Sequence, residues 1–185
     1  PEEFGRRVTI FLKNGAQPMI GKPKSVPTKE FSLDKFIGRY WTVWRGPVDG
    51  DGISGEEDID NRSLALTVIK LSRVSFWTCL KQGESSIKGE EKLRRLKEKS
   101  GAIRLGGNAF FGLWNDYLTK GESSVLKWIF RNQGRDEFDL MGLILRNPKD
   151  GRRHVFCFYQ HENGRCDWHC PWLGRYGTDG SASAV

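Results

Sequence analysis

The chain has 185 residues, of which 37% are hydrophobic and 12% aromatic, and this composition excludes an intrinsically disordered protein. No apolar run approaches the roughly 20 residues that a membrane-spanning helix requires. The formal net charge of +7 favours a negatively charged partner, because a field of this sign concentrates nucleic acid or an anionic membrane near the surface.

The first 30 residues combine a predicted strand with a basic loop. Residues 6–13 alternate apolar and polar side chains and end at Asn14-Gly15, which is typical of a strand that enters a turn. Residues 16–29 contain three prolines and three lysines, so we expect an extended surface loop there. Lys22 and Lys24 in this loop are candidate anion-binding residues.

Residues 31–45 change from a helical to a strand pattern. Ser32 can cap a short helical turn that ends at Gly38, and residues 40–45 then alternate as a strand. This stretch resembles the lipocalin signature, a Phe-x-x-x-Lys-Phe-x-Gly-x-Trp run that leads into the first barrel strand, with Tyr40 where that family has its tryptophan. The resemblance covers about a dozen residues. It implies a closed barrel that carries a small apolar ligand.

The next 37 residues divide into an acidic part and a strand-like part. Residues 46–62 carry six acidic side chains and one basic one, and their order does not match a calcium-binding EF-hand, so they predict a flexible acidic loop. Residues 63–82 are rich in β-branched and aromatic side chains. They predict either two strands or one long bent strand.

Residues 87–99, IKGEEKLRRLKEK, form the clearest helix by composition. Only a thin apolar stripe runs along it, so we expect most of the helix to face solvent. Acidic residues near its start and basic residues near its end would stabilise any exposed helix through its dipole. It is nevertheless the best candidate for a phosphate-contacting surface, formed by Lys92, Arg94, Arg95, Lys97 and Lys99.

A second predicted helix, residues 109–120, is apolar along one face and should dock on a sheet, because its large side chains recur at helical spacing. Residues 124–131 and 137–146 look like strands, and the short turns after them favour an antiparallel meander that extends to about residue 172. The small, polar residues 177–185 predict a disordered tail.

Residues 151–173 hold all three histidines and three of the four cysteines. Asn163-Gly164 favours a two-residue type I′ turn, and the resulting hairpin would pair Cys157 with Cys170 and His161 with Cys166. These two pairs would lie about 13 Å apart along the strands, so an ideal hairpin does not form a single metal site.

Three interpretations of this hairpin stay open. It could consist of aromatic core strands with buried free thiols, or it could contain a disulfide between Cys157 and Cys170. Alternatively the second strand breaks early and a zinc ion is bound. The candidate zinc ligands are Cys157, His161, Cys166 and His169.

These elements predict an α+β fold, with a mostly antiparallel sheet or meander, one apolar helix packed on it and one exposed basic helix, in a single domain over residues 1–176. The expected function is a non-enzymatic binding module for a polyanion, RNA or DNA, which uses the basic helix, the N-terminal loop, Arg152 and Arg153. The alternative is a structural protein that coats an anionic membrane or self-associates, as viral matrix proteins do. Four unevenly spaced cysteines favour a reducing compartment, the cytoplasm or the nucleus, and zinc is the one cofactor considered.

Overall fold

The structure is a computed structural model and describes residues 25–178 and 181–185. The predicted strand over residues 6–13, Lys22 and Lys24 lie outside these residues. In chain order the elements are β1 (Ser25–Pro27), α2 (Leu33–Phe36), β2 (Thr42–Val43), α3 (Asn61–Leu64), β3 (Val68–Lys70), the 3₁₀ turn η1 (Leu71–Arg73), β4 (Phe76–Trp77), β5 (Ser86–Lys88), α4 (Gly89–Lys97), α5 (Gly107–Lys120), the 3₁₀ turn η2 (Gly121–Ser123), α6 (Val125–Gln133), β6 (Glu137–Arg146), β7 (Arg153–Gln160), β8 (Cys166–His169), β9 (Tyr176–Thr178) and β10 (Ser181–Ala184).

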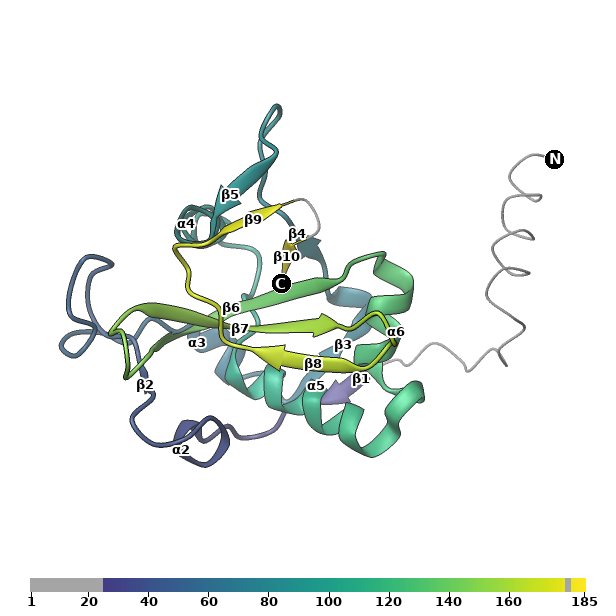
Figure 1. Cartoon of the computed structure of the whole chain (residues 1–185). Coiled ribbons are helices and arrows are strands. Elements are labelled where there is room, and N and C mark those ends of the chain that lie inside the picture. Colours follow the sequence, from purple (N-terminus) through teal and green to yellow (C-terminus); the bar gives the residue numbers. More distant parts are fainter. Residues whose placement is uncertain (1–24, 179–180) are drawn as a thin grey trace.

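A six-stranded mixed sheet forms the centre of the molecule (Figure 1). Strands β6, β7 and β8 form the predicted antiparallel meander. On the other side of β6, β10 runs parallel to its first half and β2 runs antiparallel to its second half, while β4 pairs with β10. Two smaller antiparallel pairs, β1 with β3 and β5 with β9, lie beside this sheet. The predicted α+β class is therefore confirmed.

Helices α5 and α6 cover one face of the sheet (Figure 1). The ring of Phe110 on α5 stacks on Phe156 and Phe158 of β7, with centroids 4.1 and 4.7 Å apart. The predicted apolar helix is thus confirmed, and it ends as expected at Gly121, which adopts a positive φ of 53°. This side of the sheet holds the larger apolar core.

Helix α4 packs on the opposite face. Leu93 and Leu96 of α4 are buried against Met141, Ile144 and Val155 of the sheet. The helix predicted over residues 87–99 exists, but the expectation that it is mostly exposed is wrong, because Lys92, Leu93 and Leu96 are buried against the sheet. Among the described helices, none is both long and apolar enough to cross a membrane.

Two predicted elements differ from the structure. Residues 125–133 form helix α6 rather than a strand, with Ser124 as its N-cap: the Lys127 backbone N–H donates to Ser124 Oγ at 3.2 Å. The tail is also not disordered in the part that is described. Residues 176–178 form β9, and residues 181–184 form the buried strand β10 between β4 and β6.

The described residues do not form the barrel implied by the lipocalin resemblance. In the described chain the strand order of the main sheet runs from β4 at one edge to β8 at the other, and helices pack directly on both faces. The short helical turn that carried the resemblance does form, as α2, and ends as expected before Gly38. Its Phe36 packs against Phe110 and Trp168, so the turn covers one end of the larger core.

Between β10 and β2, the segment that leads into α5 lies against the middle of β6. The Gly142 N–H donates to the carbonyl of Leu105 at 2.8 Å. A side chain at position 142 would collide with the carbonyl of Arg104, so glycine is required for this close approach. The contact fixes residues 104–105 against the sheet.

Candidate functional site

The predicted phosphate-binding residues of α4 are engaged inside the protein. Lys92 is only 2% exposed, and its ammonium donates to Asp139 Oδ2 at 2.9 Å and to the Ser181 carbonyl at 3.1 Å. It faces the sheet, because it lies on the same side of the helix as Leu93 and Leu96. Lys92 is therefore not available to a ligand at the surface.

Arg94 and Arg95 of α4 are paired with acidic side chains. Arg94 Nε lies 2.7 Å from Glu91 Oε2, and the same guanidinium bonds Glu98. Arg95 Nη1 lies 2.5 Å from Glu84 Oε2, and its Nε lies 2.7 Å from Glu91 Oε1. The hydrogen bond from Arg95 lowers the pKa of Glu84 to about 2, and those from Arg94 and Arg95 do the same for Glu91. These carboxylates are thus ionised at neutral pH.

The acidic loop neutralises two more predicted contacts. Asp58 Oδ1 lies 2.8 Å from Lys97 Nζ, and Asp58 Oδ2 lies 2.9 Å from Arg153 Nη2. Arg153 is buried and also pairs with Glu90 at 3.0 Å. Burial alone would raise the pKa of Asp58, but the hydrogen bonds and charges of Lys97 and Arg153 outweigh it and lower the pKa. Arg152 is exposed and stacks on Trp172 at 4.6 Å, apart from this network.

A groove lies beside these paired charges, between β3 and residues 98–105; we call it the β3 groove. Its volume is about 840 Å³, within the usual range of about 300–1,000 Å³ for ligand sites. Its floor is largely apolar and includes Leu105, the residue held against β6. The apolar lining residues are Leu66, Val68, Ile69, Val74, Trp77, Ile103, Leu105 and Val185.

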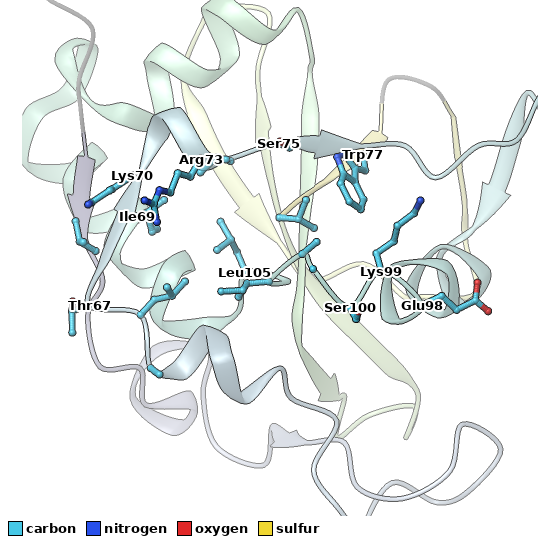
Figure 2. Close-up of a pocket in the computed structure, with 18 residues that line it drawn as sticks. Thr67, Ile69, Lys70, Arg73, Ser75, Trp77, Glu98, Lys99, Ser100 and Leu105 are labelled. Carbon is cyan, nitrogen blue, oxygen red and sulfur yellow. The ribbon is translucent and has the colours of Figure 1, made fainter.

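Three exposed cations stand at the rim of the β3 groove, and the described chain provides no acidic partner for any of them. Figure 2 shows Lys70 and Arg73 at one end of the groove and Lys99 with Trp77 at the other, with Leu105 between the two ends. The ammonium of Lys99 lies 5.5 Å from the centroid of the Trp77 ring. Trp77 is half-buried, so one part of its ring remains accessible beside a positive charge.

Sequence reasoning found Lys99 but missed Lys70, Arg73 and Trp77. The run KLSR over residues 70–73 was part of a predicted strand pair, in which basic side chains are ordinary surface residues. The 3₁₀ turn η1 instead separates two short strands, β3 and β4, that belong to different sheets. The sequence feature that could have indicated this break is Ser72-Arg73, which lies between two apolar runs of residues 63–82.

The four candidate zinc ligands lie in three separate places. Cys157 lies directly opposite His169 on neighbouring strands, with Glu137 beside them. His161 lies at the hairpin loop, where its Nε2 is 3.5 Å from Asp167 Oδ2. Cys166 points into the larger core on the other face of the sheet. The structure therefore joins two of the four predicted ligands.

The predicted hairpin register is wrong by one residue. The His161 N–H donates to the Arg165 carbonyl at 2.9 Å across a three-residue loop, in which Gly164 has φ +83°. A loop of this kind adds one residue to the turn relative to type I′. Cys157 therefore faces His169 and not Cys170.

All four cysteines are free thiols, so the alternative of a Cys157–Cys170 disulfide is not realised. Burial raises the pKa of Cys166 to about 11 and that of Cys170 to about 12. Burial, together with the charges of Asp139 and Glu137, raises the pKa of Cys157 well above its ordinary value. These thiols are protonated at neutral pH and are poor nucleophiles in the protein alone.

We found no match to this chain among protein-family models, curated proteins or solved structures.

Proposed function

We propose that the protein is a non-enzymatic binding module for single-stranded nucleic acid, with the β3 groove as its interface. One observation carries this proposal: the described part of the chain gives Lys70, Arg73 and Lys99 no acidic partner, whereas the cations of α4 are paired. An unpaired lysine or arginine can neutralise a phosphate and release its counterion, which is the main source of affinity for nucleic acid. The proposed interface thus lies beside helix α4, and Lys99, just past the end of α4, is the one contact predicted on the basic helix that it includes.

The rest of the groove suits a single strand better than a duplex. Bases are free to leave a stack only in single strands, where aromatic side chains can bind their faces. Trp77 offers such a face next to Lys99, and the apolar floor can receive a base between the two ends of the rim. Phosphates on either side would then meet Lys70 and Arg73.

The salt dependence of binding tests this proposal. With three phosphate contacts, the logarithm of the association constant for a labelled single-stranded oligonucleotide should fall with log salt at a slope of about −2. Replacing Arg73 with alanine should weaken binding and reduce the magnitude of that slope by about 0.7, since one contact is lost. Fluorescence anisotropy at several salt concentrations measures both quantities.

Arg45→Ala is the matched control, because it removes the same charge from an exposed residue that is paired with Glu57 outside the groove. It should leave both affinity and slope unchanged. If Arg45→Ala weakens binding as much as Arg73→Ala, affinity follows the net charge of the protein and the groove assignment is wrong. Binding whose affinity ignores salt would contradict the proposal as a whole.

Replacing Trp77 with leucine tests the stacking contact. The loss of one base–aromatic stack should cost about 1–3 kcal/mol, with the salt slope unchanged, because no charge is removed. Trp172→Leu is a suitable control, since Trp172 is exposed and stacks on Arg152 outside the groove. An unaltered affinity for Trp77→Leu would exclude stacking at this residue.

A membrane surface is the competing partner for the same cations. Flotation with vesicles that contain acidic lipid, beside the oligonucleotide titration, separates the two. Binding to these vesicles without binding to oligonucleotides would favour the membrane-coating alternative over the proposed function. An intracellular site of action, the cytoplasm or nucleus, is part of the proposal and fits four free thiols; self-association stays a prediction.

A further inference from the structure

A row of chemically reactive side chains crosses three neighbouring strands on the α4 side of the sheet. Asp139 of β6 lies directly opposite Cys157 of β7, which lies directly opposite His169 of β8. Glu137 is two residues before Asp139 and so points to the same face. One ligand atom each of Glu137, Cys157 and His169 lies within 4.8 Å of the other two.

Asp139 adds an independent observation. Its residue is only 5% exposed, and its Oδ1 has no hydrogen-bond partner among the described residues. The other oxygen, Oδ2, accepts from Lys92, so Lys92 holds the carboxylate in place from the side of α4. A buried carboxylate oxygen without a donor is costly unless a cation completes the site.

The three side chains form a ligand set that suits a borderline-soft divalent ion. Zinc binds cysteine sulfur at about 2.3 Å and imidazole nitrogen or carboxylate oxygen at about 2.0–2.2 Å. Around a tetrahedral ion such bonds place the ligand atoms roughly 3.5 Å apart, so the present separations would close by about 1 Å through side-chain rotation. His169 is exposed, and the ion can therefore enter from solvent.

We propose that Glu137, Cys157 and His169 bind one zinc ion, with Asp139 Oδ1 beside it. This ligand set differs from the one expected from the sequence, since Glu137 and Asp139 replace His161 and Cys166. It does not depend on the nucleic-acid proposal, because the cluster and the β3 groove share none of these residues.

In the absence of a metal ion, the guanidinium of Arg175 provides the positive charge beside these side chains. Its Nη2 lies 3.4 Å from Glu137 Oε2, 3.7 Å from Asp139 Oδ1 and 3.9 Å from Cys157 Sγ. Zinc binding would displace this guanidinium towards solvent and release the thiol proton of Cys157. Arg175 is therefore a competitor of the metal, and its removal should strengthen binding.

Titration of the full chain with Co²⁺ tests the site, since cobalt bound to a thiolate gives a charge-transfer absorption band. We expect one ion per chain, displaced by zinc, and the band should be lost in Cys157→Ser. Because Cys157 is buried and its replacement could unfold the protein, His169→Ala is the second variant. It removes an exposed side chain and should weaken binding more than about 10-fold.

The chain offers matched controls for both variants. Cys170→Ser removes a thiol on a neighbouring part of the fold, and His161→Ala removes an imidazole that contacts Tyr159, as His169 does. Both should bind the ion as the unaltered protein does. Arg175→Gln should bind it about 10-fold more tightly, a gain that a purely structural role for Arg175 would not produce. Failure of the unaltered chain to bind Co²⁺ or Zn²⁺, or equal binding by His169→Ala and His161→Ala, would overturn the proposal.

Discussion

Asp58 links the acidic loop, α4 and β7 through one carboxylate, whose side chain is 9% exposed. Replacing it with asparagine would leave Arg153, 3% exposed, with Glu90 alone. Breaking a buried ion pair typically costs about 3–5 kcal/mol, and because Glu90 remains we expect about 3 kcal/mol for Asp58→Asn at pH 7. Urea denaturation measures this free energy of unfolding.

The pH dependence of that cost follows from the pKa of Asp58, which is lower in the folded protein than in the unfolded chain. Its contribution to stability is therefore complete above about pH 4 and is lost as the pH falls through the folded pKa. The difference in free energy of unfolding between the unaltered protein and Asp58→Asn should therefore be smaller at pH 3 than at pH 7. Glu57→Gln is the control: Glu57 is in an exposed pair with Arg45, so the substitution should lower the free energy of unfolding by less than about 1 kcal/mol. If the loss of stability in Asp58→Asn does not change with pH, this account is wrong.

At the scale of the element, α6 shows how a short helix can resemble a strand. Residues 124–131 are rich in β-branched and aromatic side chains, which favours a strand, and a helix of nine residues offers few periods to read. Its buried residues Val125, Leu126, Ile129 and Phe130 nevertheless follow helical spacing. The helix is fixed by its ends, with Ser124 as N-cap and Gly134 in the left-handed region at φ +58°.

Replacement of Ser124 by alanine should therefore destabilise the protein by about 1 kcal/mol, since the Lys127 N–H would lose its acceptor. The neighbouring Ser123→Ala is the matched control: Ser123 is exposed and its hydroxyl donates to the Lys120 carbonyl. Thermal unfolding of both variants gives the comparison. A similar loss of stability in both would mean that the cap contributes nothing specific to α6.

The candidate sites depended on local details that composition does not encode. The elements with long or strongly patterned sequences, α4, α5, β6 and β7, were predictable from composition, periodicity and turn residues. The metal cluster was not predictable in this way, because one extra residue in the hairpin loop determines whether Cys157 lies opposite His169 or Cys170. The β3 groove was not predictable either. Whether a cation is paired with an acidic residue depends on tertiary contacts between distant segments, such as the one between Lys97 and Asp58.

At the scale of the whole molecule, β10 holds the sheet together. It lies between β4 and β6, and its four residues are at most 4% exposed although they are only serine and alanine. Small residues have weak strand propensity, which is why the sequence predicted disorder here, but they fit where neighbouring layers pack closely. Tertiary packing thus overrides the local preference.

Deletion of residues 181–185 should abolish cooperative unfolding and the near-ultraviolet circular dichroism of the tryptophans, because β4 and one half of β6 would lose their neighbour. Ser183→Ala is the control, since Ser183 Oγ is buried without a hydrogen-bond partner in the described chain and its removal should cost nothing. A truncated protein that still unfolds cooperatively would show that β10 is dispensable.

The parallel pairing of β10 with β6 also determines when the sheet can be completed during synthesis on the ribosome. Between the synthesis of β6 and that of β10, 34 residues must be added, and for that interval the nascent chain exposes an unpaired strand edge that could capture another polypeptide. Folding of the sheet is therefore expected to finish only after β10 has left the exit tunnel, and until then chaperones can bind the unpaired edge of β6.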